Sequence, residues 1–131
     1  MNAPSSLRIF IVENHADTLK WLKLYLEQRG HTVCAASTLN EAVESFPSSG
    51  CNVLISDIGL PDGDGWKLME RLGPLPGVFP IAMSGFGMNA DSASSRAVGY
   101  RHHLLKPFTV AELTAVLKEA ANEAAGSPVK V

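Results

Sequence analysis

Short apolar runs and amphipathic stretches alternate along this chain. The apolar runs, each ending in polar or turn residues, predict strands at 7–12, 31–36, 53–55, 79–83 and 100–105. Helices are predicted at about 15–29, 39–46, 65–72 and 88–98, with a last helix after Thr109. Strands that alternate with helices pair in parallel, and right-handed crossovers place helices on both faces of the sheet. The pattern therefore predicts an α/β fold with a doubly wound, five-stranded parallel sheet.

The sequence supports the predicted helices unequally. In the first and last helices, apolar residues form a core stripe that consists of Leu19, Leu22, Leu26, Leu113, Val116, Leu117 and Ala120. Capping boxes that begin at Thr38 and Thr109 predict the starts of the second and fifth helices. The helix at 88–98 has low helix propensity and few large apolar residues, so we expect it to be mobile.

The stretch from Val53 to Trp66, VLISDIGLPDGDGW, contains the strongest candidate site. Its apolar start predicts a strand buried on both faces, and Asp57 follows at the carboxyl end of that strand. Ligands of open α/β sheets bind outside the carboxyl ends of the strands, so Asp57 is a site candidate by position. In the glycine-rich loop that follows, Asp62 is predicted to be a turn residue and Asp64 a helix N-cap.

Polar residues also follow three other predicted strands. Glu13 and Asn14 come after the first strand, Ser84 after the fourth and Lys106 after the fifth. Taken singly, Ser84 is typical of a turn and Lys106 of a solvated surface. Because the carboxyl ends of parallel strands lie at one edge, however, these side chains can converge on Asp57. Carboxylate and amide oxygens suit Mg²⁺, and a carboxylate beside Mg²⁺ and an ammonium can attack a phosphoryl group.

Composition narrows the range of partners. The chain has 131 residues, a net charge of −2 and no basic run, which argues against nucleic acid and anionic membranes. No apolar run is long enough to span a bilayer, and residues 1–6 lack the pattern of a signal peptide, so we expect a cytoplasmic protein.

Cys34 and Cys51 lack metal-binding spacing and are predicted to be buried free thiols. His102 and His103 are adjacent on a strand, so they point to opposite faces and cannot chelate one metal together.

From about Leu7 to Ala125 the chain resembles the receiver domains of two-component response regulators, through the motifs IVEN, ISDIGLPDGDGW, MSG and LLKPF. The resemblance implies a flavodoxin-like sheet of strand order 2-1-3-4-5, a receiver domain at 7–125 and flexible tails at 1–6 and 126–131. It implies a signalling module rather than an enzyme, which accepts a phosphoryl group from a histidine kinase or a histidine phosphotransfer domain. The IVENH opening and the loop after Asp57 resemble receivers attached to hybrid histidine kinases, and a stand-alone shuttle is the alternative.

The resemblance also implies an acceptor and a metal site. Asp57 matches the phosphoacceptor. Glu13, Asn14, Asp57 and the backbone carbonyl of Gly59 match the Mg²⁺ ligands. Because the family usually has a carboxylate where this chain has Asn14, the site loses one negative charge. That charge is worth up to ~4 kcal/mol at about 4 Å and an effective dielectric of about 20, so we expect weak metal binding.

Further positions match the switch of the family. Ser84 matches the switch hydroxyl, Lys106 the phosphate-binding lysine and His103 the position of the switch aromatic. Alone, His103 is equally typical of a partly buried, hydrogen-bonded residue. The bond before Pro107 is usually cis in the family. Phosphorylation is expected to change the surface of the fourth helix, fifth strand and fifth helix, which also offers a homodimer interface.

Two alternatives and one expected property complete the interpretation. A pseudo-receiver that only binds partners is the alternative function, since Asn14 weakens the metal site. A hydrolase of the haloacid dehalogenase kind requires a second aspartate where Gly59 stands, which argues against that class. Gly59 and Phe86 offer no polar side chain to orient a hydrolytic water, so the phosphorylated form is expected to be long-lived.

Overall fold

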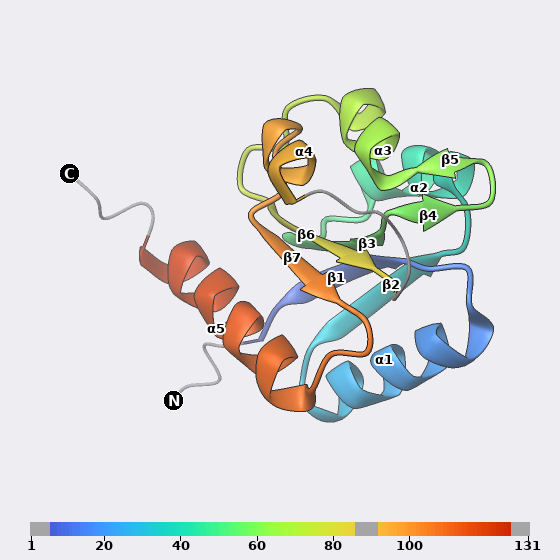
Figure 1. Ribbon diagram of the computed structural model, residues 1–131. Helices are drawn as coiled ribbons and strands as arrows, with labels where there is room; N and C mark the ends of the chain where they lie inside the picture. Colours follow the sequence, from blue (N-terminus) through green and yellow to red (C-terminus); the bar gives the residue numbers. More distant parts are fainter. Residues whose placement is uncertain (1–5, 86–91, 127–131) are drawn as a thin grey trace.

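The computed structural model describes residues 6–85 and 92–126 and shows a five-stranded parallel sheet covered by helices (Figure 1). The strands are β1 (Arg8–Val12), β2 (Thr32–Ala36), β3 (Val53–Asp57), β6 (Phe79–Ser84) and β7 (His102–Leu105). They lie in the order β2-β1-β3-β6-β7, and every neighbouring pair is parallel. Counted within this sheet, the order is 2-1-3-4-5, so the predicted doubly wound fold is confirmed.

The helices cover both faces of the sheet. They are α1 (Ala16–Gln28), α2 (Leu39–Ser45), α3 (Gly65–Leu72), α4 (Ser92–Ala97) and α5 (Val110–Gly126). Side chains alternate along β1, so that Ile9 and Ile11 join the core cluster of α1 and α5. Phe10 and Val12 point the other way and join the cluster of α2 and α3. The sheet is therefore buried on both faces, as the apolar runs predict.

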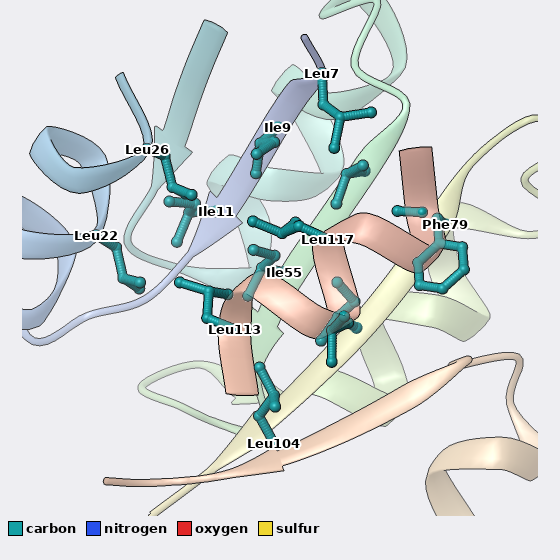
Figure 2. Close-up of a cluster of buried hydrophobic side chains, with 14 of the residues drawn as sticks. Leu7, Ile9, Ile11, Leu22, Leu26, Ile55, Phe79, Leu104, Leu113 and Leu117 are labelled. Carbon is teal, nitrogen blue, oxygen red and sulfur yellow. The ribbon is translucent and has the colours of Figure 1, made fainter. Parts of the chain in front are cut away.

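Figure 2 shows how the side chains of α1 and α5 meet the sheet. Leu22 and Leu26 from α1, and Leu113 and Leu117 from α5, gather around Ile55 of β3 in one buried cluster. The predicted core stripes are confirmed, except that Leu19 is only partly buried. Each fully buried leucine contributes roughly 2 kcal/mol to folding, so these two helices are held on the sheet mainly by apolar contacts.

Three segments differ from the prediction. Residues 59–64, predicted as a loop, contain a small antiparallel hairpin made of β4 (Gly59–Leu60) and β5 (Gly63–Asp64). The loop after α2 begins with a short 3₁₀ helix, η1 (Phe46–Ser48). The last strand begins at His102 rather than Tyr100, whose buried hydroxyl instead donates to the backbone oxygen of Gly65 at 2.8 Å.

Some predicted features lie outside the described residues. The predicted fourth helix begins at Met88, whereas the described helix α4 begins at Ser92, and residues 86–91 are not described. Phe86 falls in the same gap. Of the predicted tails only Ser6 and Gly126 are described, and the Ser6 hydroxyl donates to the backbone oxygen of Gly30 at 2.9 Å.

Two predictions from composition can be compared with the structure. Cys34 and Cys51 are both free, and Cys51 is buried whereas Cys34 is only half-buried. Within 6–85 and 92–126, no helix combines the length and the apolar character needed to cross a bilayer. Neither cysteine needs a disulfide to hold this fold, which has a continuous core on each side of the sheet.

The predicted N-caps are present at three helix starts. The side chains of Thr38, Asp64 and Thr109 each accept a hydrogen bond from the backbone N–H three residues further on, at 3.0, 2.7 and 3.0 Å. Each bond satisfies one of the backbone donors that the first turn of a helix leaves open. The local sequence therefore determines where α2, α3 and α5 begin.

Asp62 has a role that its predicted place in a turn does not reveal. Its Oδ1 accepts from the backbone N–H of Leu39 at 2.7 Å, and its Oδ2 accepts from that of Asn40 at 3.0 Å. Hydrogen bonds from the backbone, with that of Asn40 the largest contribution, lower the pKa of Asp62. One carboxylate thus ties the loop after Asp57 to the start of α2.

Replacing Asp62 with alanine is expected to lower the Tm by a few degrees at neutral pH, because α2 loses two acceptors for its first N–H groups. The pKa of Asp62 is lowered in the folded protein. Its stabilisation is therefore present above the ordinary aspartate pKa of about 3.9 and is lost as the pH falls further. Thermal unfolding of both proteins at neutral pH and at about pH 2 tests this.

The two proteins should differ at neutral pH and converge in acid. Glu44→Ala, which removes an exposed carboxylate from the same helix, is the control and should change the Tm little. Equal Tm values for wild type and Asp62→Ala at neutral pH would contradict a capping role.

Candidate functional site

The polar residues at the strand ends converge at the carboxyl edge of the sheet. The ammonium of Lys106, after β7, donates to Oε1 of Glu13, after β1, and to Oδ2 of Asp57 at 3.1 Å, at the end of β3. Glu13 is 0% exposed and Asp57 6% exposed. Residues from three strands, far apart in the sequence, therefore form one buried ion cluster.

The charge balance keeps Lys106 protonated. Burial lowers the pKa of Lys106, but the hydrogen bond to Glu13 and the charge of Asp57 outweigh it, and the pKa lies above its ordinary value. Two carboxylates share one ammonium, so the cluster carries one uncompensated negative charge. A buried site with excess negative charge attracts a further cation.

Glu13 and Asp57 are also held by the backbone. Oε2 of Glu13 accepts from the N–H of His15 at 3.0 Å, and Oδ1 of Asp57 accepts from the N–H of Gly59 at 3.2 Å. Behind Asp57, a Cβ at Gly65 would lie 2.8 Å from the Asp57 carbonyl oxygen, closer than real contacts allow. The hairpin loop can therefore close over the end of β3 only because Gly65 has no side chain.

Ser84 and His103 meet beside this cluster. Ser84 is 0% exposed, and its Oγ lies 2.8 Å from Nε2 of His103, which is half-buried. His102 points away from this pair and lies 2.8 Å from Oε1 of Glu119. The prediction that His102 and His103 serve different faces of the sheet is confirmed. The Lys106–Pro107 peptide bond that follows is cis.

The oxygen donors at this edge fit Mg²⁺. Glu13 and Asp57 both contact the same ammonium, so their carboxylates face one small volume. Asn14 directly follows Glu13 in the chain and is exposed, and the Gly59 carbonyl belongs to the hairpin that follows Asp57. Within the two described ranges, no three His, Cys, Asp or Glu side chains gather as a metal site. A bound Mg²⁺ would thus depend on backbone carbonyl, amide and water oxygens as well, which this ion accepts readily.

Ser95, which contacts His103, and Trp66, which contacts Ser95, have no signal in the sequence that assigns them to this site. Ser95, from α4, lies 3.2 Å from Nδ1 of His103, and the indole N–H of Trp66, from α3, donates to Ser95 at 2.9 Å. The sequence predicts only that Trp66 lies in the helix at 65–72 and that Ser95 lies in the weak helix at 88–98. A tryptophan that begins a helix and a serine within a helix are both common, so only the tertiary structure shows that they meet.

The fold and the ion cluster define a receiver-type signalling domain, in which an aspartate at the end of the third strand of the sheet faces a lysine after the last. The family model described as the response regulator receiver domain matches residues 9–118. The chain therefore belongs to the response regulator receiver family.

Individual relatives agree with this assignment. The KDP operon transcriptional regulatory protein KdpE of Escherichia coli is 31% identical over 112 residues, which are 86% of this chain but 50% of that protein. A CheY-like receiver domain protein from Methanospirillum hungatei is 29% identical and superposes with a TM-score of 0.85, over 93% of this chain and 98% of that one. A third similar structure is the receiver domain of the sensor histidine kinase PA1611 from Pseudomonas aeruginosa, which was solved with magnesium in its active-site cleft. It is 22% identical and superposes with a TM-score of 0.78 over 89% of this chain and 98% of that one, and at this identity it shows the shared fold.

Replacing Lys106 with methionine is expected to lower the free energy of unfolding by about 3 kcal/mol in the presence of a chelator, because Glu13 keeps a buried charge without its partner. The pKa of Lys106 is raised in the folded protein. Its stabilisation is therefore complete below the ordinary lysine pKa of about 10.4 and is lost as the pH rises through the raised value. Urea unfolding measured from neutral to strongly alkaline pH tests both statements.

The stability of the wild type should fall at alkaline pH more steeply than that of Lys106→Met. Lys118→Met, at an exposed lysine of α5, should behave as the wild type. A Lys106→Met protein as stable as the wild type at neutral pH would contradict the proposed energetic role of the ion cluster.

Proposed function

We propose that this chain accepts a phosphoryl group on Asp57 from a phosphohistidine of a partner protein. The observation that carries the proposal is the carboxylate of Asp57 held 3.1 Å from the ammonium of Lys106 at the carboxyl edge of the sheet. A carboxylate oxygen of Asp57 attacks phosphorus, the P–N bond to the donor imidazole breaks, and an acyl phosphate forms. The imidazole leaves with the electron pair of that bond and takes up a proton.

The neighbouring side chains stabilise the transferred group. Lys106 neutralises charge that spreads over the phosphoryl oxygens, and the hydroxyl of Ser84 donates a hydrogen bond to one of them. Glu13, Asn14, Asp57 and the Gly59 carbonyl are the residues that would hold Mg²⁺. When bound, this ion supplies further positive charge at the phosphoryl oxygens.

The donor is a histidine kinase or a histidine phosphotransfer domain. The family assignment supports this class of partner, because receiver domains are signalling modules. The chain spans half the length of KdpE, so any output beyond the receiver domain is not part of this proposal. A cytoplasmic location follows from the same partners.

The expected output surface is formed by α4, β7 and α5. Leu105 at the end of β7 is 67% exposed and Val110 at the start of α5 is 44% exposed, so this face carries apolar side chains without a cover from the described residues. Exposed apolar residues are typical of contact surfaces. They support a switching surface here, and a homodimer through the same face.

Asn14 favours one alternative. An exposed amide contributes no charge to the metal site, so a pseudo-receiver that binds partners without phosphorylation remains the second candidate. Gly59, at the position of the second aspartate of haloacid dehalogenases, gives no support to hydrolase chemistry. The expected long life of the phosphorylated form rests on Gly59 and on Phe86, which lies outside the described residues.

Incubation with acetyl phosphate and Mg²⁺ is expected to add one phosphoryl group to the wild type. Asp57→Ala should show no adduct, because the nucleophilic carboxylate is absent. Asp64→Asn, which alters a helix-cap aspartate of the adjoining loop, is the matched control and should be modified like the wild type. Intact-mass spectrometry measures the outcome, and a wild type without an adduct would support the pseudo-receiver.

Replacing Asn14 with aspartate is expected to lower the dissociation constant for Mg²⁺ several-fold. The new carboxylate restores one charge at the metal site, and its exposure reduces the gain well below the unscreened Coulomb limit. Mg²⁺ titrations followed by NMR shifts of backbone amides near Asp57 measure both constants. Equal constants would show that the amide does not limit metal binding.

A further inference from the structure

An open cavity lies between α1 and α5. Its volume is about 590 Å³, and its lining comes from α1, from the turn that follows α1, and from α5. The hydroxyls of Tyr25 and Thr114, which both line it, lie 3.2 Å apart and join the two helices. Small molecules bind in cavities of roughly 300–1,000 Å³, so this one is large enough to hold such a ligand.

The cavity is separate from the ion cluster of Asp57. α1 begins shortly after Glu13 and α5 shortly after Lys106, so both helices start near the cluster and lead away from it (Figure 1). The lining includes the end of α1 and also His31, which directly precedes β2. The cavity therefore lies toward the opposite edge of the sheet.

The floor of the cavity is apolar. Leu26 is 0% exposed and Leu117 6% exposed, and both belong to the core cluster that α1 and α5 share. Ala121, partly buried, packs against the same cluster. An apolar ligand body placed on these side chains would lose its contact with water, which favours binding.

The rim of the cavity carries positive charge. Arg29 and Lys118 line it, and no aspartate or glutamate does. Carboxylates of the same two helices bond cations outside the lining, since Glu27, Glu119 and Glu123 pair with Lys23, His102 and Arg101 respectively. In the part of the chain that the structure describes, Arg29 and Lys118 form no salt bridge. A chain of net charge −2 thus has a local site for an anion.

Arg29 and His31 are held in place as hydrogen-bond donors. The guanidinium of Arg29 lies over the ring of Tyr25, 5.3 Å from its centre, and its planar fork matches a carboxylate. Nδ1 of His31 accepts from the backbone N–H of Leu7 at 3.0 Å. Burial and the charge of Arg29 lower the pKa of His31, so at neutral pH the ring is uncharged and carries its proton on Nε2.

We propose that this cavity binds a small organic carboxylate. The apolar body of the ligand, one or two rings in size, packs on Leu26, Leu117 and Ala121. Its carboxylate accepts hydrogen bonds from Arg29 and Lys118 at the rim. The site does not use Asp57, so the inference goes beyond the phosphoryl transfer proposed above and does not rest on it.

Naphthalene-2-carboxylate is the probe that tests the charge of the ligand. Titrated into the full chain, it should cause saturable NMR shifts of the backbone amides of His31, Lys118 and Asn122, which line the cavity. Naphthalene-2-carboxamide, an uncharged molecule of the same shape, should bind about tenfold more weakly, because charge-assisted hydrogen bonds are the stronger kind.

Variants test the two cations. Arg29→Gln and Lys118→Gln should each weaken binding of the carboxylate about fivefold, the effect of one hydrogen bond. Lys67→Gln, at an exposed lysine of α3, is the matched control and should bind like the wild type. Asp57→Ala should also bind like the wild type, whether or not the chain accepts a phosphoryl group.

A larger side chain tests the floor. Ala121→Leu keeps both cations but fills part of the cavity, so the carboxylate should raise the Tm of the wild type and not that of this variant. Shifts that do not saturate or that lie away from the cavity would overturn the proposal, as would equal affinities for the carboxylate and the carboxamide or for the wild type and both charge variants. Shifts of the same amides that depend on protein concentration without the probe would show that a second copy of the chain occupies the cavity, and would also overturn it.

Discussion

Two buried carboxylates compete for one ammonium at the carboxyl edge of this sheet, and the site depends on that shortage of positive charge. Glu13 and Asp57 both bind Lys106, although they follow different strands. Charges are costly to bury unless they are paired, so β1, β3 and β7 must end at the same level for the cluster to form. The same shortage leaves one negative charge that a second cation would balance, and under the proposed function it lets Lys106 exchange one carboxylate partner for a phosphoryl group.

A glycine and a capping aspartate hold the loop after Asp57 in place at this edge of the sheet. Gly65 lets the chain pass close to the Asp57 carbonyl, and Asp62 fastens the loop to the start of α2. Both features hold the loop against the end of β3, where the Asp57 side chain is buried in the ion cluster.

Most of the fold could be predicted from the sequence, because the signals are local. A short apolar run identifies β1, apolar residues at helical spacing identify the core faces of α1 and α5, and N-caps such as Thr109 mark where helices begin. The β4–β5 hairpin was missed because its glycines indicate only a turn. The contact between Trp66 and Ser95, 29 positions apart, depends on how α3 and α4 pack, and no periodicity within either helix carries that information.

The central claim is that Lys106 passes from stabilising Asp57 to stabilising a phosphoryl group on it. A crystal structure of the protein with beryllofluoride and Mg²⁺, a stable mimic of the acyl phosphate, tests this most directly. We expect beryllium bonded to an Asp57 oxygen, with Lys106 and the Ser84 hydroxyl each in contact with a fluorine atom. A structure soaked with saturating beryllofluoride in which Asp57 is unmodified and Lys106 still bridges both carboxylates would contradict the claim.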